Sequence, residues 1–86
     1  MKRLEIDKDF LETQYVDRQK MPWEIGAYLG ISDPTVRVKI KEHSIPMRTL
    51  VESMAIMRLR RKEGNMPMTY PDAKAQIEKE IANDGN

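Results

Sequence analysis

The feature that most constrains this chain is Gly30, which separates two short stretches with helical spacing of apolar residues. Before it, Ile25 and Leu29 lie four residues apart, so they share one face of a helix. Glycine adopts the left-handed backbone conformation without steric cost, so Gly30 is expected to end that helix. After it, Ser32 and Pro34 are typical of a helix start, because serine caps free N–H groups and proline is tolerated in a first turn. The sequence therefore predicts two short helices joined by a sharp turn.

The second of these helices has two faces of different chemistry. Val36 and Ile40 lie four residues apart and form its inner face. An apolar inner face combined with a hydrogen-bonding and cationic outer face is typical of a helix that reads the DNA major groove. An arginine paired with guanine contributes about 1–3 kcal/mol of discrimination between bases, so Arg37 is the most specific candidate. The residues expected to read base edges are Asp33, Thr35, Arg37, Val38 and Lys41.

Residues 24–36, Glu-Ile-Gly-Ala-Tyr-Leu-Gly-Ile-Ser-Asp-Pro-Thr-Val, resemble the helix-turn-helix signature E-I-A-x-x-L-G-V-S-x-x-T-V of resolvase-type, sigma-factor and phage DNA-binding domains. Residues 41–48, Lys-Glu-His-Ser-Ile-Pro-Met-Arg, are similar to the K-x-H-G-I-P-x-R tail of such modules in phage proteins and homing endonucleases. The resemblance covers roughly residues 8–55 and implies a tri-helical DNA-binding unit. The chain departs from the pattern twice. Gly26 replaces the usual alanine, which is expected to loosen the first helix of the motif, and Ser44 replaces the usual glycine, which makes the following turn less favourable.

The rest of the chain is predicted to be helical apart from its connections. A first helix is expected over residues 8–19, capped by Asp7, and the preceding Lys2 and Arg3 form either a basic arm that reaches DNA or a solvated terminus. Pro46 disfavours helix at the residue before it, so an extended segment follows the motif. The predicted fold is all-α, with a helix-turn-helix core and basic extended tail (1–48) and a helical extension (49–86) made of a basic helix (49–63), a linker (64–71) and an acidic helix (72–83).

The helix at 49–63 has clear boundary signals and a broad apolar stripe. Thr49 and Glu52 form a capping box, and Gly64 fits the position after the last turn. The stripe is broad enough to require burial on two sides, against the core and against a second subunit. We therefore expect helices 49–63 and 72–83 to pack either on the core or on a second subunit, the latter as a homodimer. The stripe consists of Leu50, Val51, Met54, Ala55, Met57 and Leu59, and the inner face of the last helix of Ala73, Ile77 and Ile81.

The net charge of the chain is only +1, but its charges are divided unevenly. Residues 37–62 carry eight basic side chains against two acidic ones, whereas the rest carries seven basic and twelve acidic ones. Such segregation is typical of a protein with one phosphate-facing surface, although a chance run of cations on solvated helices would also produce it. The residues expected to contact the DNA backbone are Tyr28, Ser32, Lys39, Arg48, Arg58, Arg60, Arg61 and Lys62.

Several of these residues also have a structural interpretation. Tyr28 would otherwise be a plain surface tyrosine on the outer side of its helix, and Arg48 would form a surface salt bridge with Glu52. Cations at residues 58–62 also complement the dipole of a helix C-terminus. The single tryptophan, Trp23, is expected to pack between the first and second helices, and the alternative is a contact with a partner or with DNA.

Composition and the scatter of reactive side chains exclude several classes of function. The chain has no cysteine and one histidine, so we expect no disulfide framework, metal site or cofactor. It has no apolar run of about 18 residues, so we expect a cytoplasmic protein without membrane contact. Its carboxylates and serines form no catalytic pattern, so we expect neither an enzyme nor a small-molecule ligand.

The function most consistent with these patterns is sequence-specific binding of double-stranded DNA by a small phage or mobile-element protein that regulates transcription. The alternatives are the DNA-targeting module of a homing or restriction endonuclease, and a terminase small subunit. An interaction adaptor that acts on a host enzyme without DNA is a further alternative, of a different class.

Overall fold

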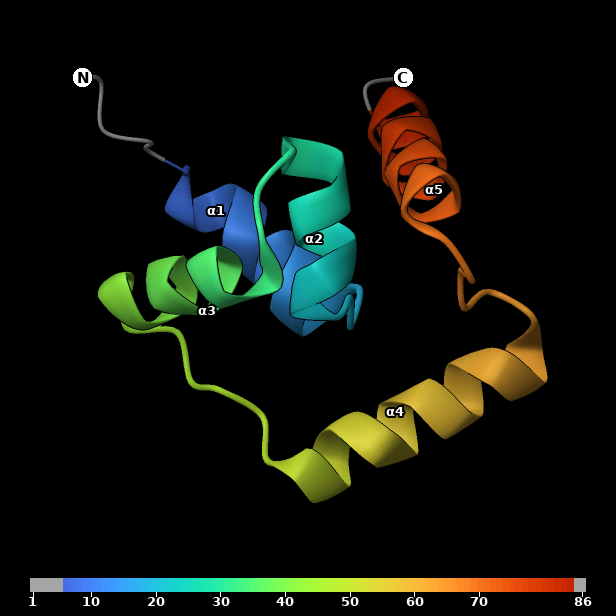
Figure 1. Cartoon of the computed structure of the whole chain (residues 1–86), viewed down its shortest axis with the longest axis horizontal. Coiled ribbons are helices and arrows are strands. Elements are labelled where there is room, and N and C mark those ends of the chain that lie inside the picture. Colours follow the sequence, from blue (N-terminus) through green and yellow to red (C-terminus); the bar gives the residue numbers. More distant parts are fainter. Residues whose placement is uncertain (1–5, 85–86) are drawn as a thin grey trace.

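The computed structural model describes residues 6–84, and all regular elements in that part of the chain are helices. The predicted all-α class is confirmed for these residues, whereas Lys2 and Arg3 lie outside them. Figure 1 shows α1, α2 and α3 gathered together, with α5 alongside α2 and α4 standing apart. The elements are α1 (Lys8–Leu11), the π-helix η1 (Glu12–Asp17), α2 (Pro22–Leu29), α3 (Asp33–Glu42), α4 (Leu50–Glu63) and α5 (Tyr70–Asp84).

The first helix is capped as predicted but changes its pitch halfway. The Asp7 side chain accepts a hydrogen bond from the Asp9 amide at 3.3 Å. From Glu12 onward the helix widens, and the Arg18 amide donates to the carbonyl five residues back, at Thr13. The helix ends before Gln19, whose backbone is left-handed with φ of 57°. The expected single helix is therefore an α-helix continued by a π-helix.

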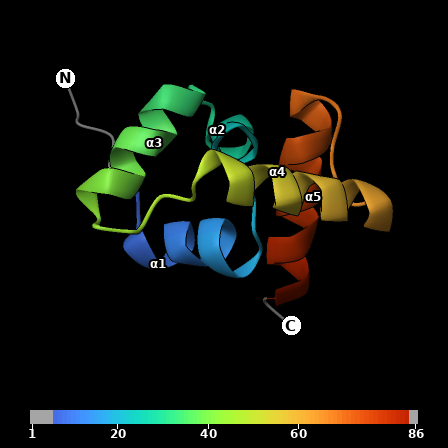
Figure 2. The same ribbon diagram turned by 90° about the horizontal axis from the view of Figure 1, so that it is seen from below.

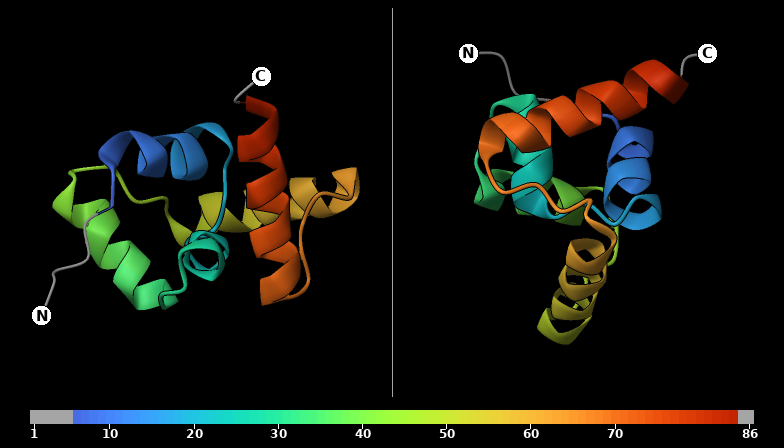
Figure 3. Two further views of the ribbon diagram at one scale, coloured as in Figure 1. Left: turned by 90° about the horizontal axis from the view of Figure 1, so that it is seen from above. Right: turned by 90° about the vertical axis from the view of Figure 1, so that its right-hand side faces the viewer.

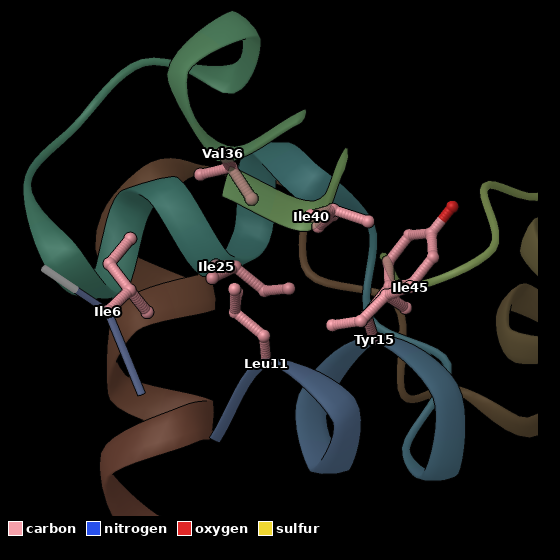
Figure 4. Close-up of a cluster of buried hydrophobic side chains, with 7 residues drawn as sticks. All are labelled: Ile6, Leu11, Tyr15, Ile25, Val36, Ile40 and Ile45. Carbon is pink, nitrogen blue, oxygen red and sulfur yellow. The ribbon is translucent and has the colours of Figure 1, made fainter. Parts of the chain in front are cut away.

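The core is a cluster of apolar side chains from α1, η1, α2, α3 and the segments that flank them (Figure 4). The predicted inward positions Ile25, Val36 and Ile40 are confirmed, because all three are completely buried. Each fully buried side chain of this size stabilises the fold by about 1.5–3 kcal/mol. The buried members of the cluster are Ile6, Leu11, Tyr15, Ile25, Val36, Ile40 and Ile45.

The turn between α2 and α3 depends on two glycines. Gly30 is left-handed as predicted, with φ of 76°, and its amide donates to the Gly26 carbonyl at 2.7 Å. Ser32 caps α3 as predicted, by accepting from the Thr35 amide at 3.4 Å. At Gly26, a β-carbon would lie 2.5 Å from the carbonyl oxygen of Ile31. The expectation that Gly26 loosens the helix is therefore wrong, because this glycine allows the turn to pass directly over α2.

The turn after α3 forms although a serine occupies its left-handed position. Ser44 has φ of 58°, and its amide donates to the Lys41 carbonyl at 3.0 Å. The Ile45 amide donates to the Ile40 carbonyl at 3.1 Å, which completes a Schellman motif. Both isoleucines are buried in the core, so the motif returns the chain onto the helix it has just left.

The two C-terminal helices are placed very differently. α4 has the predicted boundaries, with the Thr49–Glu52 capping box at its start and left-handed Gly64 after its end. Its apolar stripe is not covered by the core, because Leu50 and Val51 are 75% and 77% exposed. Figure 2 and Figure 3 show that α4 projects from the body, whereas α5 lies across α2.

α5 is attached to α2 through its predicted inner face. Ala73 and Ile77 are completely buried, and Ile81 is half-buried. Trp23 on α2 meets Tyr70 on α5 edge-to-face, with ring centroids 5.7 Å apart. The prediction that Trp23 packs between the first two helices is therefore wrong, because its ring faces the last helix instead.

We expect Gly26→Ala to lower the free energy of unfolding by about 1–3 kcal/mol, since the new methyl group collides with the Ile31 carbonyl. Urea unfolding followed by circular dichroism measures this change. An alanine inside an unobstructed helix would instead stabilise the protein by about 0.5–1 kcal/mol, and that result would contradict the close approach.

We expect Ser44→Gly to raise the free energy of unfolding by about 0.5–1 kcal/mol. It removes the strain of a left-handed serine, about 1–2 kcal/mol, but adds freedom to the unfolded chain. The thermal midpoint should then rise by a few degrees. Ser53→Gly, inside α4, is the matched control and should lower the thermal midpoint. A higher midpoint with Ser53→Gly, or a lower one with Ser44→Gly, would show that the left-handed backbone does not strain Ser44.

Candidate nucleic-acid interface

The outer face of α3 is open to solvent, while its inner face is sealed by the core. Val36 and Ile40 are completely buried, whereas Val38 is 52% exposed and Lys41 is also exposed. Arg37 projects from the same outer side with a side chain 58% exposed. This part of the predicted base-reading set therefore shares one accessible face of a helix.

The remaining members of the set lie at the start of α3. The Asp33 carboxylate is 28% exposed and accepts from Arg37 Nε at 2.6 Å, an i, i+4 ion pair along the helix. Thr35 is half-buried, and its hydroxyl lies 2.8 Å from the hydroxyl of the exposed cap Ser32. An exposed pair of this kind is worth no more than about 1 kcal/mol, so Arg37 can exchange Asp33 for a stronger acceptor.

Arg60 does not lie on the surface, and the prediction that it contacts the DNA backbone is wrong. It is 5% exposed, and its guanidinium forms a bidentate ion pair with the completely buried Glu24 on α2. Arg60 Nε and Nη2 donate to the Asn65 side chain and carbonyl at 3.2 and 3.1 Å, and Nη1 donates to the Gln19 carbonyl at 3.3 Å. All five N–H groups of the guanidinium therefore have an acceptor within the chain.

The Glu24 carboxylate accepts hydrogen bonds from the start of α2 and from α4 at the same time. Its Oε1 accepts from the Met21 amide at 2.9 Å, which caps the first turn of α2, and from Arg60 Nη1. Its Oε2 accepts from Arg60 Nη2 at 2.8 Å. A carboxylate buried without such partners would be strongly unfavourable, so the position of α4 is tied to the start of α2.

Arg48 is half-buried and its guanidinium is bonded within the chain, contrary to the predicted phosphate contact. Its guanidinium lies 3.9 Å from the centre of the Tyr15 ring and donates to the carbonyls of Tyr15 and Lys20 at 2.6 and 2.7 Å. Burial of the guanidinium lowers the pKa of Arg48 from its ordinary value. The alternative surface bridge to Glu52 is not formed either, because that carboxylate caps α4. Arg48 instead anchors the segment between α3 and α4.

The other predicted backbone contacts divide into exposed and covered residues. Arg58, Arg61 and Lys62 on α4 are exposed. Lys39 has a side chain only 12% exposed and pairs with Glu42 at 3.3 Å. Tyr28 faces α1 rather than the outer side of α2, since its ring stacks on Phe10 with centroids 5.7 Å apart. The exposed cations on α4 are therefore the better placed candidates.

A second buried polar contact holds α5 to the connection between η1 and α2. Lys20 is 2% exposed, and its ammonium donates to Glu80 at 2.8 Å and to Gln76 at 3.2 Å. Gln76 also donates to the Asn65 carbonyl at 2.8 Å, which joins this contact to that of Arg60. Sequence reasoning missed the roles of Glu24 and Lys20. The position of Glu24 at the third residue of α2 was an available signal for its cap to the Met21 amide, but no local signal indicated its burial.

A groove of about 360 Å³ separates the start of α3 from α4. Its wall includes Asp33 and Arg37 from α3, Trp23 from α2, and Leu50 and Met57 from α4. Within residues 6–84, no group of three or more acidic, histidine or cysteine side chains is arranged to hold a metal ion. No helix in that same span has the length and apolar character needed to cross a membrane.

Comparison of the chain with protein-family models, with curated proteins and with solved structures found no match. The function of the outer face of α3 is therefore inferred from its own residues.

We expect Arg60→Ala to lower the free energy of unfolding by about 3–5 kcal/mol, because it leaves the Glu24 charge buried without its partner. Arg58→Ala, an exposed arginine on the same helix, is the matched control and should change it by less than about 0.5 kcal/mol. Urea unfolding measures both variants. Combining Arg60→Met with Glu24→Gln should cost less than the sum of the two single changes. Equal effects of Arg60→Ala and Arg58→Ala would show that the buried pair does not hold α4.

Proposed function

We propose that this chain binds double-stranded DNA in a sequence-specific manner. In this proposal α1, η1, α2 and α3 form a helix-turn-helix unit, and α3 enters the major groove. The observation that carries the proposal is the contrast between the two faces of α3. Its inner face is fully buried, whereas Arg37, Val38 and Lys41 remain exposed together on the outer face.

The chemistry of that outer face matches the edges of base pairs. An arginine fork pairs with the two acceptors of guanine, and a carboxylate such as Asp33 accepts from the amino group of cytosine. The methyl groups of Val38 suit contact with the methyl group of thymine. Thr35 and Lys41 add a hydroxyl and a second cation. Because Asp33 and Arg37 are paired in the free protein, the two residues are proposed to separate onto different bases.

Phosphate contacts are assigned to groups that remain accessible. The Ser32 hydroxyl lies at the N-terminus of α3, where free N–H groups favour an anion. Arg58, Arg61 and Lys62 supply cations from α4, and Arg60 acts indirectly by fixing that helix relative to α2. Each phosphate neutralised contributes about 0.9 to the slope of log affinity against log salt. Tyr28 and Lys39 remain weaker candidates for the same role.

The process that such binding serves is proposed to be transcriptional regulation in a phage or mobile element. That part rests on the helix-turn-helix signature at residues 24–36 alone. A DNA-targeting module of an endonuclease and a terminase small subunit would use the same face of α3 and are therefore not distinguished by it.

We expect Arg37→Ala to weaken binding to a site selected from a random duplex library by about 1–3 kcal/mol, with little change on random duplexes. The paired change Arg58→Ala and Arg61→Ala should weaken both kinds of duplex alike and lower the salt slope by about 1.8. Fluorescence anisotropy over a range of salt concentrations measures these effects.

The matched control is Lys74→Ala on α5, a 56% exposed cation outside the proposed surface, which should leave both affinities unchanged. Equal losses on selected and random duplexes for both arginine variants would overturn the assigned roles. Negligible binding of the unaltered chain to random DNA at low salt would overturn DNA binding itself and favour an interaction adaptor.

A further inference from the structure

The outer face of α4 is apolar and uncovered within the described chain. Leu50 and Val51 are 75% and 77% exposed, and Met54, one turn further along the same side, is 49% exposed. Large contiguous apolar surfaces of this kind usually mark an interaction site. In Figure 3, α4 projects away from the remaining helices, which leaves room for another element beside it.

The same face combines a projecting side chain with a hollow that can receive one. A hollow of about 300 Å³ is lined by Met54, Met57, Arg58 and Arg61. These four residues have the spacing i, i+3, i+4 and i+7, which is the set that surrounds a hole in knobs-into-holes packing of two helices. Leu50 projects one turn before Met54 and is three-quarters exposed, as a knob must be.

We propose that the outer face of α4 binds the same face of a second copy of this chain, with the two helices antiparallel. Leu50 of each copy then fills the hollow of the other. In this register residue 50 lies opposite the middle of residues 54–61, so Met54 lies beside its own counterpart at the two-fold axis. A contact of this kind is self-complementary and closes as a dimer.

Among the apolar surfaces of this chain, the outer face of α4 in a second copy is the best partner for the same face in the first copy. The other large apolar side chains exposed in residues 6–84 are scattered over different elements: Val16 on η1, Val38 on α3, Met68 in the linker and Tyr70 at the start of α5. The inner face of α5 is already occupied by α2, since Ala73 and Ile77 are buried there. Pairing α4 with α4 therefore removes apolar surface from water on both sides.

The charges of α4 select the antiparallel orientation. Arg58, Arg61 and Lys62 lie in the second half of the helix, while Leu50, Val51 and Met54 lie in the first half. A parallel pair would place the two cationic halves side by side, which is unfavourable. An antiparallel pair centred on Met54 sends them to opposite ends and lays the aliphatic stem of Arg58 along the partner's first turn.

Sedimentation equilibrium of the full chain without DNA tests the proposal. We expect a concentration-dependent monomer–dimer equilibrium, which Leu50→Glu and Met54→Glu weaken at least tenfold. Val16→Glu, a 51% exposed apolar residue on η1, is the matched control and should leave the equilibrium unchanged. Thermal unfolding by circular dichroism establishes that each variant is folded. A monomer at every concentration, or a dimer unaffected by both α4 variants, would overturn the proposal.

Disulfide trapping tests the register. The chain has no cysteine, so an introduced one can form a disulfide only between copies. Met54→Cys should give a covalent dimer on mild oxidation, because residue 54 lies at the axis. Leu50→Cys, on the same face and also exposed, should not, because its two copies would be about 12 Å apart along the helices. Equal trapping at both positions would refute the register. Both experiments omit DNA, so their failure is independent of a failure of the proposed function.

Discussion

The arrangement of the helices depends on the buried ion pair between Glu24 and Arg60. Burying a carboxylate and a guanidinium costs several kcal/mol for each ion, and the cost is recovered only when all remaining hydrogen-bonding groups are satisfied. Here they are, because Glu24 also caps α2 and Arg60 also binds the chain at Gln19 and Asn65. Such a contact tolerates little displacement. It therefore ties the C-terminal part of α4 to α2, although α4 otherwise stands apart from the core (Figure 1).

The need to pair buried polar groups also explains why some basic residues are used inside the fold while others stay exposed. The connection between η1 and α2 runs without regular structure over residues 18–21, so its carbonyl groups need donors from elsewhere. Arg48, just before α4, and Arg60, near the end of α4, supply these donors, and Lys20 in the connection itself donates to Glu80 on α5. These cations hold the fold together. Those on the outer faces of α3 and α4 remain exposed, and the proposed DNA contacts are assigned to them.

Two surfaces of different character result from this division. The outer face of α3 carries cations and hydrogen-bonding groups on a helix whose other side is sealed, which suits recognition of a rigid polar partner such as a DNA groove. The outer face of α4 begins apolar at Leu50 and becomes cationic by Arg61, so its apolar side chains and arginine stems suit contact with another helix while the charged ends of the arginines suit phosphates. Arg60 ties α4 to α2, so the two surfaces are connected through one buried contact.

The sequence by itself determined the elements whose signals are local. Gly30, Ser32, the Thr49–Glu52 capping box and Gly64 place helix ends through contacts within a few residues, and Val36 and Ile40 identify a buried face through spacing alone. Tertiary structure decided which charged side chains are exposed to solvent and which are buried in ion pairs. Arg58, Arg60 and Arg61 are indistinguishable in a charge count, yet only Arg60 meets a buried carboxylate 36 residues away. The need for glycine at position 26 could not be predicted either. The Ile31 carbonyl that it accommodates belongs to a turn that must first fold back over α2. Local interactions can be inferred from neighbouring residues, whereas burial depends on contacts that exist only once distant segments have met.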